Sequence, residues 1–359
     1  MKYLPTLLAT ACTVAALSVT APAAHAAEMT VTSPSCGVVT ATNSTSSPWI
    51  TLLDSGDLIE VPAHASRSMR GLAGGSYSWL SGPVASETVS GSGALNVKAC
   101  TGAPTRPVDG DQNGDRRADV LGIQAQTGDL YYYRMTTTGL ASGIKAGTGW
   151  NNMVFMQQVN EIEGEGTGNY LIAVRKDGTV WRYDNKGAGK FANGTQIGSG
   201  LTGYTNFTIT GTNSALSFGG HALLASKGDS LFLFDLSRTA LEDPVEIAQG
   251  WGTTVKTIAT RDFNKDALGD LITIRSDGSM WSYTVALNGD ATFTAPRSVG
   301  HGWGAMETVT SPGSLDADPL SDLVSRRSDG NLYKYLNRGG YWGPATQIGQ
   351  NWQRIRLLA

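Results

Sequence analysis

Two short acidic loops carry the residues best suited to chemistry. The first runs from Asp111 to Asp119 and the second from Asp262 to Asp270. In both, oxygen-bearing side chains stand at loop positions 1, 3, 5 and 9, and the backbone carbonyl of position 7 is a further possible ligand. Alternate residues of a tight loop converge on its inside, and Ca²⁺ takes about six to eight oxygen ligands. The spacing predicts a calcium site in each loop. The alternative is a hydrogen-bonded turn without metal.

These loops resemble the calcium loops of FG-GAP/VCBS repeats, found in integrin-type propellers and in exported actinobacterial repeat proteins. In that family the loop joins two strands of a propeller blade and holds Ca²⁺. For the first loop the resemblance implies the ligands Asp111, Asn113, Asp115, Asp119 and the carbonyl of Arg117. For the second loop it implies Asp262, Asn264, Asp266, Asp270 and the carbonyl of Leu268. The family usually has Gly at position 6, where this chain has Arg116 and Ala267, so we expect a strained turn.

Three other stretches occupy the same place in the sequence repeat. The fifth repeat has Ser314, Asp316, Asp318 and Asp322, which make it a third candidate calcium site. The second repeat has Glu161, Glu163, Glu165 and Asn169, whose longer side chains would crowd a compact site. The third repeat has Asn213, Ala215, Ser217 and His221, and we expect that it has lost the site.

A regular repeat positions these loops. Gly-Trp or a variant of it recurs every 49 to 52 residues, with its second residue at Trp150, Leu201, Trp251, Trp303 and Trp352. A second marker keeps the same step and ends on an aromatic residue, at Tyr131, Trp181, Phe232, Trp281 and Tyr333. Repeats of this length with four short strands each are typical of propeller blades. The sequence therefore predicts an all-β fold in which residues 108–359 form a five-bladed β-propeller.

The last residues are expected to close the ring. Residues 257–261 form a strand before the acidic loop of the fourth repeat, whereas the first repeat has Pro104 and Pro107 at that place. Proline opposes strand pairing. Residues 354–359 have the composition of the missing strand. We therefore expect them to complete the first blade and to remove an open sheet edge.

Residues 27–100 predict a separate small domain. Short strand-like runs at residues 36–39, 49–53, 58–61 and 95–97 alternate with turn residues, and Tyr77 and Trp79 fall on one face. The spacing suggests an immunoglobulin-like β-sandwich. Cys36 and Cys100 bracket it and are expected to form a disulfide. The stretches 61–68 and 74–79 are similar to accessory sandwiches of exported bacterial proteins, and residues 101–107 form the linker.

Residues 1–26 read as a secretory signal peptide. Lys2 precedes an apolar run over residues 3–19, and Ala24-His25-Ala26 has the small-x-small pattern of a cleavage site. A membrane anchor is the alternative, but the run is short. No later apolar stretch reaches the length of a membrane span. We therefore expect a secreted, extracellular protein without membrane insertion.

The composition argues against two classes of function. With 27 basic and 30 acidic residues and a formal net charge of −3, the chain does not resemble a nucleic-acid binder. His64, His221 and His301 show no zinc-ligand spacing, and no nucleophile elbow is present. Carboxylate pairs are plentiful, but each already belongs to a predicted calcium loop. We therefore expect no enzymatic activity, although a glycosidase is not excluded by carboxylates alone.

Aromatic residues favour a binding function. Nine Trp and twelve Tyr are many for a lightly charged chain, and sugar rings pack well on aromatic faces. The candidate ligand-binding residues are Trp150, Trp251, Trp303, Trp352, Tyr341 and Trp342. The alternative for the repeated tryptophans is packing between blades. The same packing role is expected for Trp181, Phe232, Trp281 and Tyr333.

The favoured function is a secreted, calcium-binding, lectin-like propeller that recognises a cell-surface glycan or polysaccharide. It could be the targeting subunit of a larger secreted assembly. One alternative is a calcium-stabilised adhesion module that binds a secreted protein partner through the N-terminal domain. Another is a non-catalytic accessory domain pair of a secreted hydrolase or toxin complex.

Overall fold

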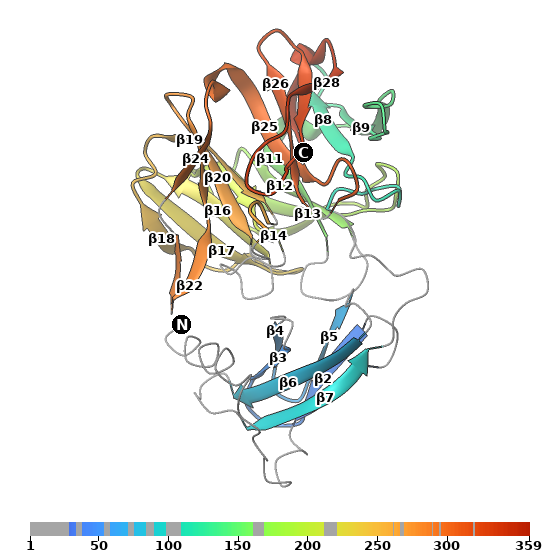
Figure 1. Cartoon of the computed structure of the whole chain (residues 1–359). Helices are drawn as coiled ribbons and strands as arrows, with labels where there is room; N and C mark the ends of the chain where they lie inside the picture. The colour runs from blue at the N-terminus through green and yellow to red at the C-terminus, as the bar shows by residue number, and fades with distance from the viewer. Residues whose placement is uncertain are drawn as a thin grey trace. The chain divides into compact units, whose positions relative to one another are not determined.

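The structure is a computed structural model of the 359-residue chain. It describes residues 29–33, 38–53, 58–70, 75–83, 90–97, 109–160, 169–211, 221–260, 262–265, 269–288, 290–293, 296–318 and 320–359. The regular elements in these ranges are β-strands and three single-turn 3-10 helices, so the all-β prediction is confirmed (Figure 1). The described residues include no helix that is both long and apolar enough to cross a membrane.

The chain divides into two compact units. The first consists of residues 1–106 together with Leu287–Thr292, and the second consists of Pro107–Ala286 and Phe293–Ala359. The predicted signal peptide, both cysteines and most of the predicted linker lie outside the described residues. Export, the disulfide and the linker therefore stay predictions.

Two antiparallel sheets form the first unit. One has the strand order β1 (Met29–Thr32), β2 (Val38–Asn43) and β5 (Ser66–Arg70). The other has the order β4 (Leu58–Val61), β3 (Trp49–Leu53), β6 (Gly75–Pro83) and β7 (Gly91–Val97). Buried apolar side chains from both sheets share one core, and Tyr77 and Trp79 pack against it from the same face of β6. The alternation of side chains along β6 therefore places both aromatic residues on one face, as the sequence predicts.

Five four-stranded antiparallel sheets form the second unit. Sheet one has the order β10 (Ile144–Gly147), β9 (Leu130–Tyr133), β8 (Val120–Gln124) and β29 (Ile355–Leu358). Sheet two contains β11 (Met153–Asn160), β12 (Asn169–Arg175), β13 (Val180–Asp184) and β14 (Thr195–Gly198). Sheet three contains β15 (Thr205–Ile209), β16 (His221–Lys227), β17 (Ser230–Leu236) and β18 (Val245–Gln249). Sheet four contains β19 (Thr254–Thr260), β20 (Asp270–Arg275), β21 (Met280–Tyr283) and β24 (Arg297–Gly300). In the sequence, β21 and β24 are separated by β22 (Val285–Asn288) and β23 (Asp290–Phe293), which form a two-stranded sheet of their own. Sheet five contains β25 (Met306–Gly313), β26 (Asp322–Arg327), β27 (Leu332–Tyr335) and β28 (Thr346–Gly349).

The five sheets surround a common axis. The strand at one edge of each sheet (β29, β11, β15, β19 and β25) contacts the corresponding strand of the next sheet, and β29 also contacts β11, so the contacts form a cycle. All five strands line one cavity of about 190 Å³. The neighbouring strands β12, β16, β20 and β26 are buried almost throughout, because sheets cover both of their faces. This is the arrangement of a β-propeller.

The closing strand is β29, as the sequence predicts. It pairs antiparallel with β8, and Leu121 and Ala359 exchange backbone hydrogen bonds of 2.8 and 3.0 Å. The guanidinium of Arg356 donates to the carbonyls of Trp150 and Met153, at the start of sheet two. The buried Arg326 of sheet five donates to the carbonyl of Ile355. β29 is therefore tied to the sheets on both sides of it.

The repeated tryptophans fill the junctions between consecutive sheets. Trp150 packs on Tyr183, with ring centroids 4.7 Å apart, and Trp352 packs on Tyr133 at 4.4 Å. The same contact joins Trp251 to Tyr283 and Trp303 to Tyr335. All four tryptophans are at most 8 % exposed. The residue before each has a positive φ, which explains the glycine of the Gly-Trp marker and its replacement once by Asn351.

Candidate functional site

The junction between sheets five and one has an open cavity of about 380 Å³, which is within the usual range for small-ligand pockets. Its apolar lining comes from Tyr131, Tyr133, Leu140, Ala141, Ile348, Trp352 and Ile355. Its polar side chains are those of Gln124, Ser142, Gln350, Asn351 and Arg354. The cavity therefore combines aromatic surface with amide, hydroxyl and guanidinium groups.

Three aromatic rings form a continuous surface in the cavity. The rings of Tyr133 and Trp352 are 4.4 Å apart and tilted by 48°, and the rings of Tyr131 and Tyr133 are 6.3 Å apart. Gly143 lies against this surface, where a Cβ would approach the ring of Tyr133 to 2.4 Å. Burial raises the pKa of Tyr133, and Tyr131 beside it adds to the effect, so the phenol stays protonated at neutral pH. Its hydroxyl can both donate and accept a hydrogen bond.

One residue at the end of the second strand distinguishes this junction from three others. Four residues are equivalent because the backbone N–H of each closes the turn that follows the second strand. The bonds run from Gln124 to Asp129, from Arg175 to Thr179, from Arg275 to Ser279 and from Arg327 to Asn331. Arg175 lies over Trp181 at 3.7 Å from the ring centroid, Arg275 over Trp281 at 4.6 Å and Arg327 over Tyr333 at 4.3 Å. These are cation–π contacts. Gln124 instead accepts a hydrogen bond from Thr127 at 3.0 Å, which leaves Tyr131 without such a cover.

A second difference lies on the adjoining segment of the chain, one residue before Ile355, which is the register partner of Gln124. Arg354 ends the single-turn helix η4 (Trp352–Arg354), and its carbonyl accepts from the N–H of Ala125. Asn152 and Thr253 accept from the corresponding N–H groups of Lys176 and Ser276 and carry no charge. Among the described residues that line the cavity, Arg354 alone is charged. Its exposed guanidinium makes no hydrogen bond or ion pair within the described part of the chain.

The predicted ligand-binding aromatics fall into two groups. Trp150, Trp251, Trp303 and Trp352 pack between sheets, which was the alternative role, and only Trp352 also lines the cavity. Trp342 packs on Phe263 at 4.8 Å, whereas Tyr341 is 59 % exposed. Neither of these two lines the cavity. Sequence reasoning missed Gln124 and Arg354. Gln124 could have been found by comparing the repeats, because the second, fourth and fifth repeats have an arginine at the position where the first has this glutamine.

The acidic loop of the first repeat is closed by its own backbone. Asp111 accepts from the N–H groups of Gly114 at 2.7 Å and Arg116 at 2.8 Å, and Asp115 accepts from Arg117 at 3.0 Å. Arg116 has a φ of 70°, so the expected strain at position 6 is present. These contacts are those of hydrogen-bonded Asx turns.

Position 9 of the loops is a buried anchor. Asp119 accepts from the N–H of Met135 at 2.8 Å and from the hydroxyl of Tyr132 at 2.9 Å. Asn113 turns its amide nitrogen, not its oxygen, toward the same carboxylate. Burial raises the pKa of Asp119 to about 6. The side chain therefore links the loop to the end of β9.

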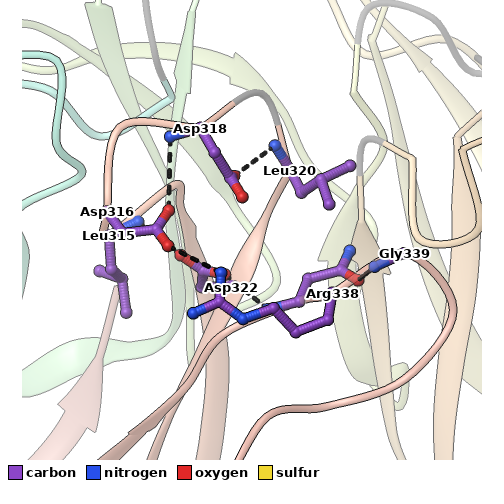
Figure 2. Close-up of polar contacts among 8 residues, drawn as sticks. Leu315, Asp316, Asp318, Leu320, Asp322, Arg338 and Gly339 are labelled. Atoms are coloured by element: carbon purple, nitrogen blue, oxygen red, sulfur yellow. Dashed lines mark hydrogen bonds and ion pairs between the residues drawn. The ribbon is translucent and has the colours of Figure 1, made fainter.

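The loop of the fifth repeat repeats this pattern (Figure 2). Asp322 accepts from the N–H of Leu315 at 2.7 Å, and Asp318 accepts from Leu320 at 2.8 Å. Asp316 forms an ion pair of 3.3 Å with Arg338. Burial raises the pKa of Asp322 to about 7.

The loop of the fourth repeat is described in part. Asp270 accepts from the N–H of Phe263 at 2.7 Å and Asp262 accepts from that of Lys265, whereas Asp266 and Leu268 lie outside the described residues. In the second and third repeats most of the loop is likewise outside. His221 is buried there, with both ring nitrogens facing backbone carbonyls.

Calcium binding by these loops stays a prediction. Within the described ranges no group of three His, Cys, Asp or Glu side chains is placed to hold a metal ion. The carboxylates of Asp111, Asp115 and Asp119 accept hydrogen bonds from N–H and O–H donors of the loop and the adjoining strands.

No family model and no curated protein matches the chain. Among solved structures, it is similar to an Agrocybe aegerita lectin described as recognising non-reducing terminal N-acetylglucosamine, with 11 % identity, a TM-score of 0.39 and coverage of 88 % of this chain and 94 % of that one. It is also similar to the BP39L lectin of Burkholderia pseudomallei, with 12 % identity, a TM-score of 0.40 and coverage of 89 % and 98 %. The Aleuria aurantia lectin matches at 13 % identity with a TM-score of 0.35, over 64 % of this chain and 77 % of that one. Likeness at this level does not decide the function of the chain.

Proposed function

We propose that the chain is a non-catalytic, lectin-like protein that binds a glycan in the cavity between sheets five and one. The observation that carries the proposal is the aromatic surface of Tyr131, Tyr133 and Trp352, which no arginine covers. The C–H face of a sugar ring packs on such a surface. The amides of Gln350 and Asn351 are exposed and lie within reach of sugar hydroxyls.

A glycan array followed by calorimetry with the best-binding sugar tests this proposal. Tyr131→Ala removes part of the aromatic surface, and Gln124→Arg restores the arginine that covers the equivalent ring in other sheets. Both should weaken binding by about fivefold or more, since a well-placed stacking ring contributes about 1 kcal/mol or more. Tyr333→Ala is the matched control, because Tyr333 is the counterpart of Tyr131 and lies under Arg327.

Two results would contradict the proposal. One is a wild-type protein that binds no sugar on the array. The other is an equal loss of binding in Tyr131→Ala and Tyr333→Ala. Capture of a fixed protein partner that free sugar does not displace would favour the adhesion module instead.

The proposal includes export and the kind of repeat. We propose a secreted five-bladed propeller of the FG-GAP/VCBS kind with an immunoglobulin-like N-terminal sandwich. Five sheets in a closed cycle and two sheets around one N-terminal core support this. Intact-mass analysis of the exported protein should show a chain that starts at Ala27 and contains a bond between Cys36 and Cys100. A mass that includes residues 1–26, or two free thiols, would overturn these two points.

Calcium is proposed from the loop spacing alone. If Ca²⁺ binds only the folded state, a hundredfold excess over its Kd stabilises that state by about 2.7 kcal/mol. The melting temperature should then be higher in millimolar Ca²⁺ than in EDTA, and the double variant Asp115→Ala with Asp266→Ala should lose most of this difference. Identical melting curves, with no calcium found by elemental analysis, would leave the loops as turns.

A further inference from the structure

The cavity between sheets five and one differs from the equivalent junctions in two linked ways. At the end of the second strand, the basic residue that lies on an aromatic ring in other sheets is replaced by the neutral Gln124. One residue before Ile355, the register partner of Gln124, Arg354 supplies a charge where Asn152 and Thr253 supply none. The positive charge is thus still present at this junction, but it no longer covers the aromatic surface.

Arg354 has the properties of a ligand-binding group. The side chain is exposed, lines the cavity and makes no hydrogen bond or ion pair with another described residue. By contrast, Arg175 donates to the hydroxyl of Tyr183, and Arg326 pairs with Glu307 at 2.6 Å. A guanidinium carries five donors in a fork that matches the two oxygens of a carboxylate or sulfate. No acidic side chain lines the cavity within the described residues, so nothing there repels an anion.

We propose that Arg354 makes this site selective for anionic sugars, which carry a carboxylate or a sulfate. This rests on the proposed glycan-binding function. The ring of such a sugar packs against Tyr131, and its anionic group pairs with Arg354. The side chains of Ser142 and Asn351 can then form hydrogen bonds with the hydroxyls of the sugar.

Calorimetry with matched sugar pairs tests the proposal. The methyl glycosides of glucuronic acid and glucose form one pair, and those of galactose 6-sulfate and galactose form another. The acidic member should bind about tenfold or more tightly than its neutral partner, as expected for a charge-assisted hydrogen bond. The comparison between the two acidic sugars distinguishes a carboxylate from a sulfate. The preference should shrink as salt is raised from 50 to 300 mM, because salt screens exposed charges.

Arg354→Gln is the decisive variant. It should abolish the preference by lowering the affinity for the acidic sugar to that of the neutral one, while the neutral affinity stays within about twofold. Arg354→Lys should retain part of the preference, since the charge remains but the fork is lost. Lys334→Gln, a charge change on the strand β27 of sheet five that does not line the cavity, is the matched control and should leave both affinities unchanged. Because the Arg354 side chain packs on nothing that it would leave unpaired, the variant should melt at the wild-type temperature.

The outcomes separate this inference from the proposed function. Neutral and acidic sugars that bind equally, with both blocked by Gln124→Arg, would overturn the selectivity and leave the sugar site standing. An equal loss for both sugars in Arg354→Gln would also overturn it, because Arg354 would then bind hydroxyls only. Absence of binding for every sugar would overturn the proposed function and the selectivity together.

Discussion

The junction between sheets five and one and the junction between sheets three and four are built around the same aromatic pair. Each has a tryptophan packed on a tyrosine, at 4.4 Å for Trp352 and Tyr133 and at 5.1 Å for Trp251 and Tyr283. In the second junction Arg275 covers Trp281, and in the first Gln124 leaves Tyr131 uncovered beside a cavity of about 380 Å³. Gln124 is therefore one difference between the two junctions, and Phe293, which packs on Trp251 at 5.6 Å in the second, is another.

The largest loss of stability is expected when the strand β29, which borders the first junction, is deleted. Removal of residues 355–359 deletes β29, which pairs with β8 and contacts β11 and β25. The ring would open, and the loss should be comparable with the whole stability of a domain, about 5–15 kcal/mol. Thermal melting followed by circular dichroism should show no cooperative transition for the second unit. A truncated protein that melts like the wild type would mean that closure does not depend on β29.

A smaller effect should come from crowding the tryptophan in either junction type. A Cβ on Gly349 would lie 2.2 Å from Nε1 of Trp352, and one on Gly147 would lie 2.8 Å from Nε1 of Trp150. Overpacking of this kind costs about 1–3 kcal/mol. Gly349→Ala and Gly147→Ala should both lower the melting temperature, with the larger drop for Gly349→Ala. Gly114→Ala would not serve as a control because its φ is positive. Ser328→Ala, in an exposed turn, is suitable and should change little.

The comparison predicts that the binding site can be copied. Arg275→Gln together with Thr253→Arg gives the junction between sheets three and four the pair of residues found as Gln124 and Arg354. If these two residues distinguish the junctions, the double variant should bind sugar at about two sites per chain, the added one being weaker. Calorimetric stoichiometry measures this, with Arg275→Gln alone as the control. An unchanged stoichiometry would mean that further residues separate the two junctions.

The smallest expected effect on stability comes from the hydrogen bond between the arginine that covers the aromatic ring and a neighbouring tyrosine. The Nη2 atom of Arg275 donates to the hydroxyl of Tyr283 at 3.2 Å, and Arg175 donates to Tyr183 in the same way. Tyr283→Phe should cost about 0.5–1.5 kcal/mol in the free energy of unfolding, measured by urea denaturation. Tyr335→Phe should cost less, since Arg327 makes no such bond in the described structure. Equal costs for the two variants would show that the hydroxyls contribute nothing specific.

Local patterns predicted much of the fold. The runs 49–53 and 58–61 are strands β3 and β4 to the residue, because alternation and turn residues fix short strands locally. The period of the Gly-Trp marker predicted the repeated sheets, and the composition of residues 354–359 predicted the closing strand.

The site was harder to predict because its residues are distant in sequence. Tyr131 and Arg354 meet at the cavity because β29 closes the ring, and no local pattern encodes that meeting. The role of the repeated tryptophans was left between packing and binding, since burial depends on the tyrosine of another strand, such as Tyr183 for Trp150. In the acidic loops, spacing identifies the oxygen atoms but not the backbone N–H groups that donate to them, such as those of Gly114 and Arg116.

The position of β29 has a consequence for how the chain matures. Synthesis proceeds from the N-terminus, so β8 exists long before its partner at residues 355–358 has been made. Until then sheet one has an unpaired edge, which can pair with another chain. Contacts between residues this distant in sequence also slow folding. A molecule interrupted before its last few residues would therefore carry four finished sheets and one adhesive edge, which makes it a target for chaperones and proteases rather than a partly active product.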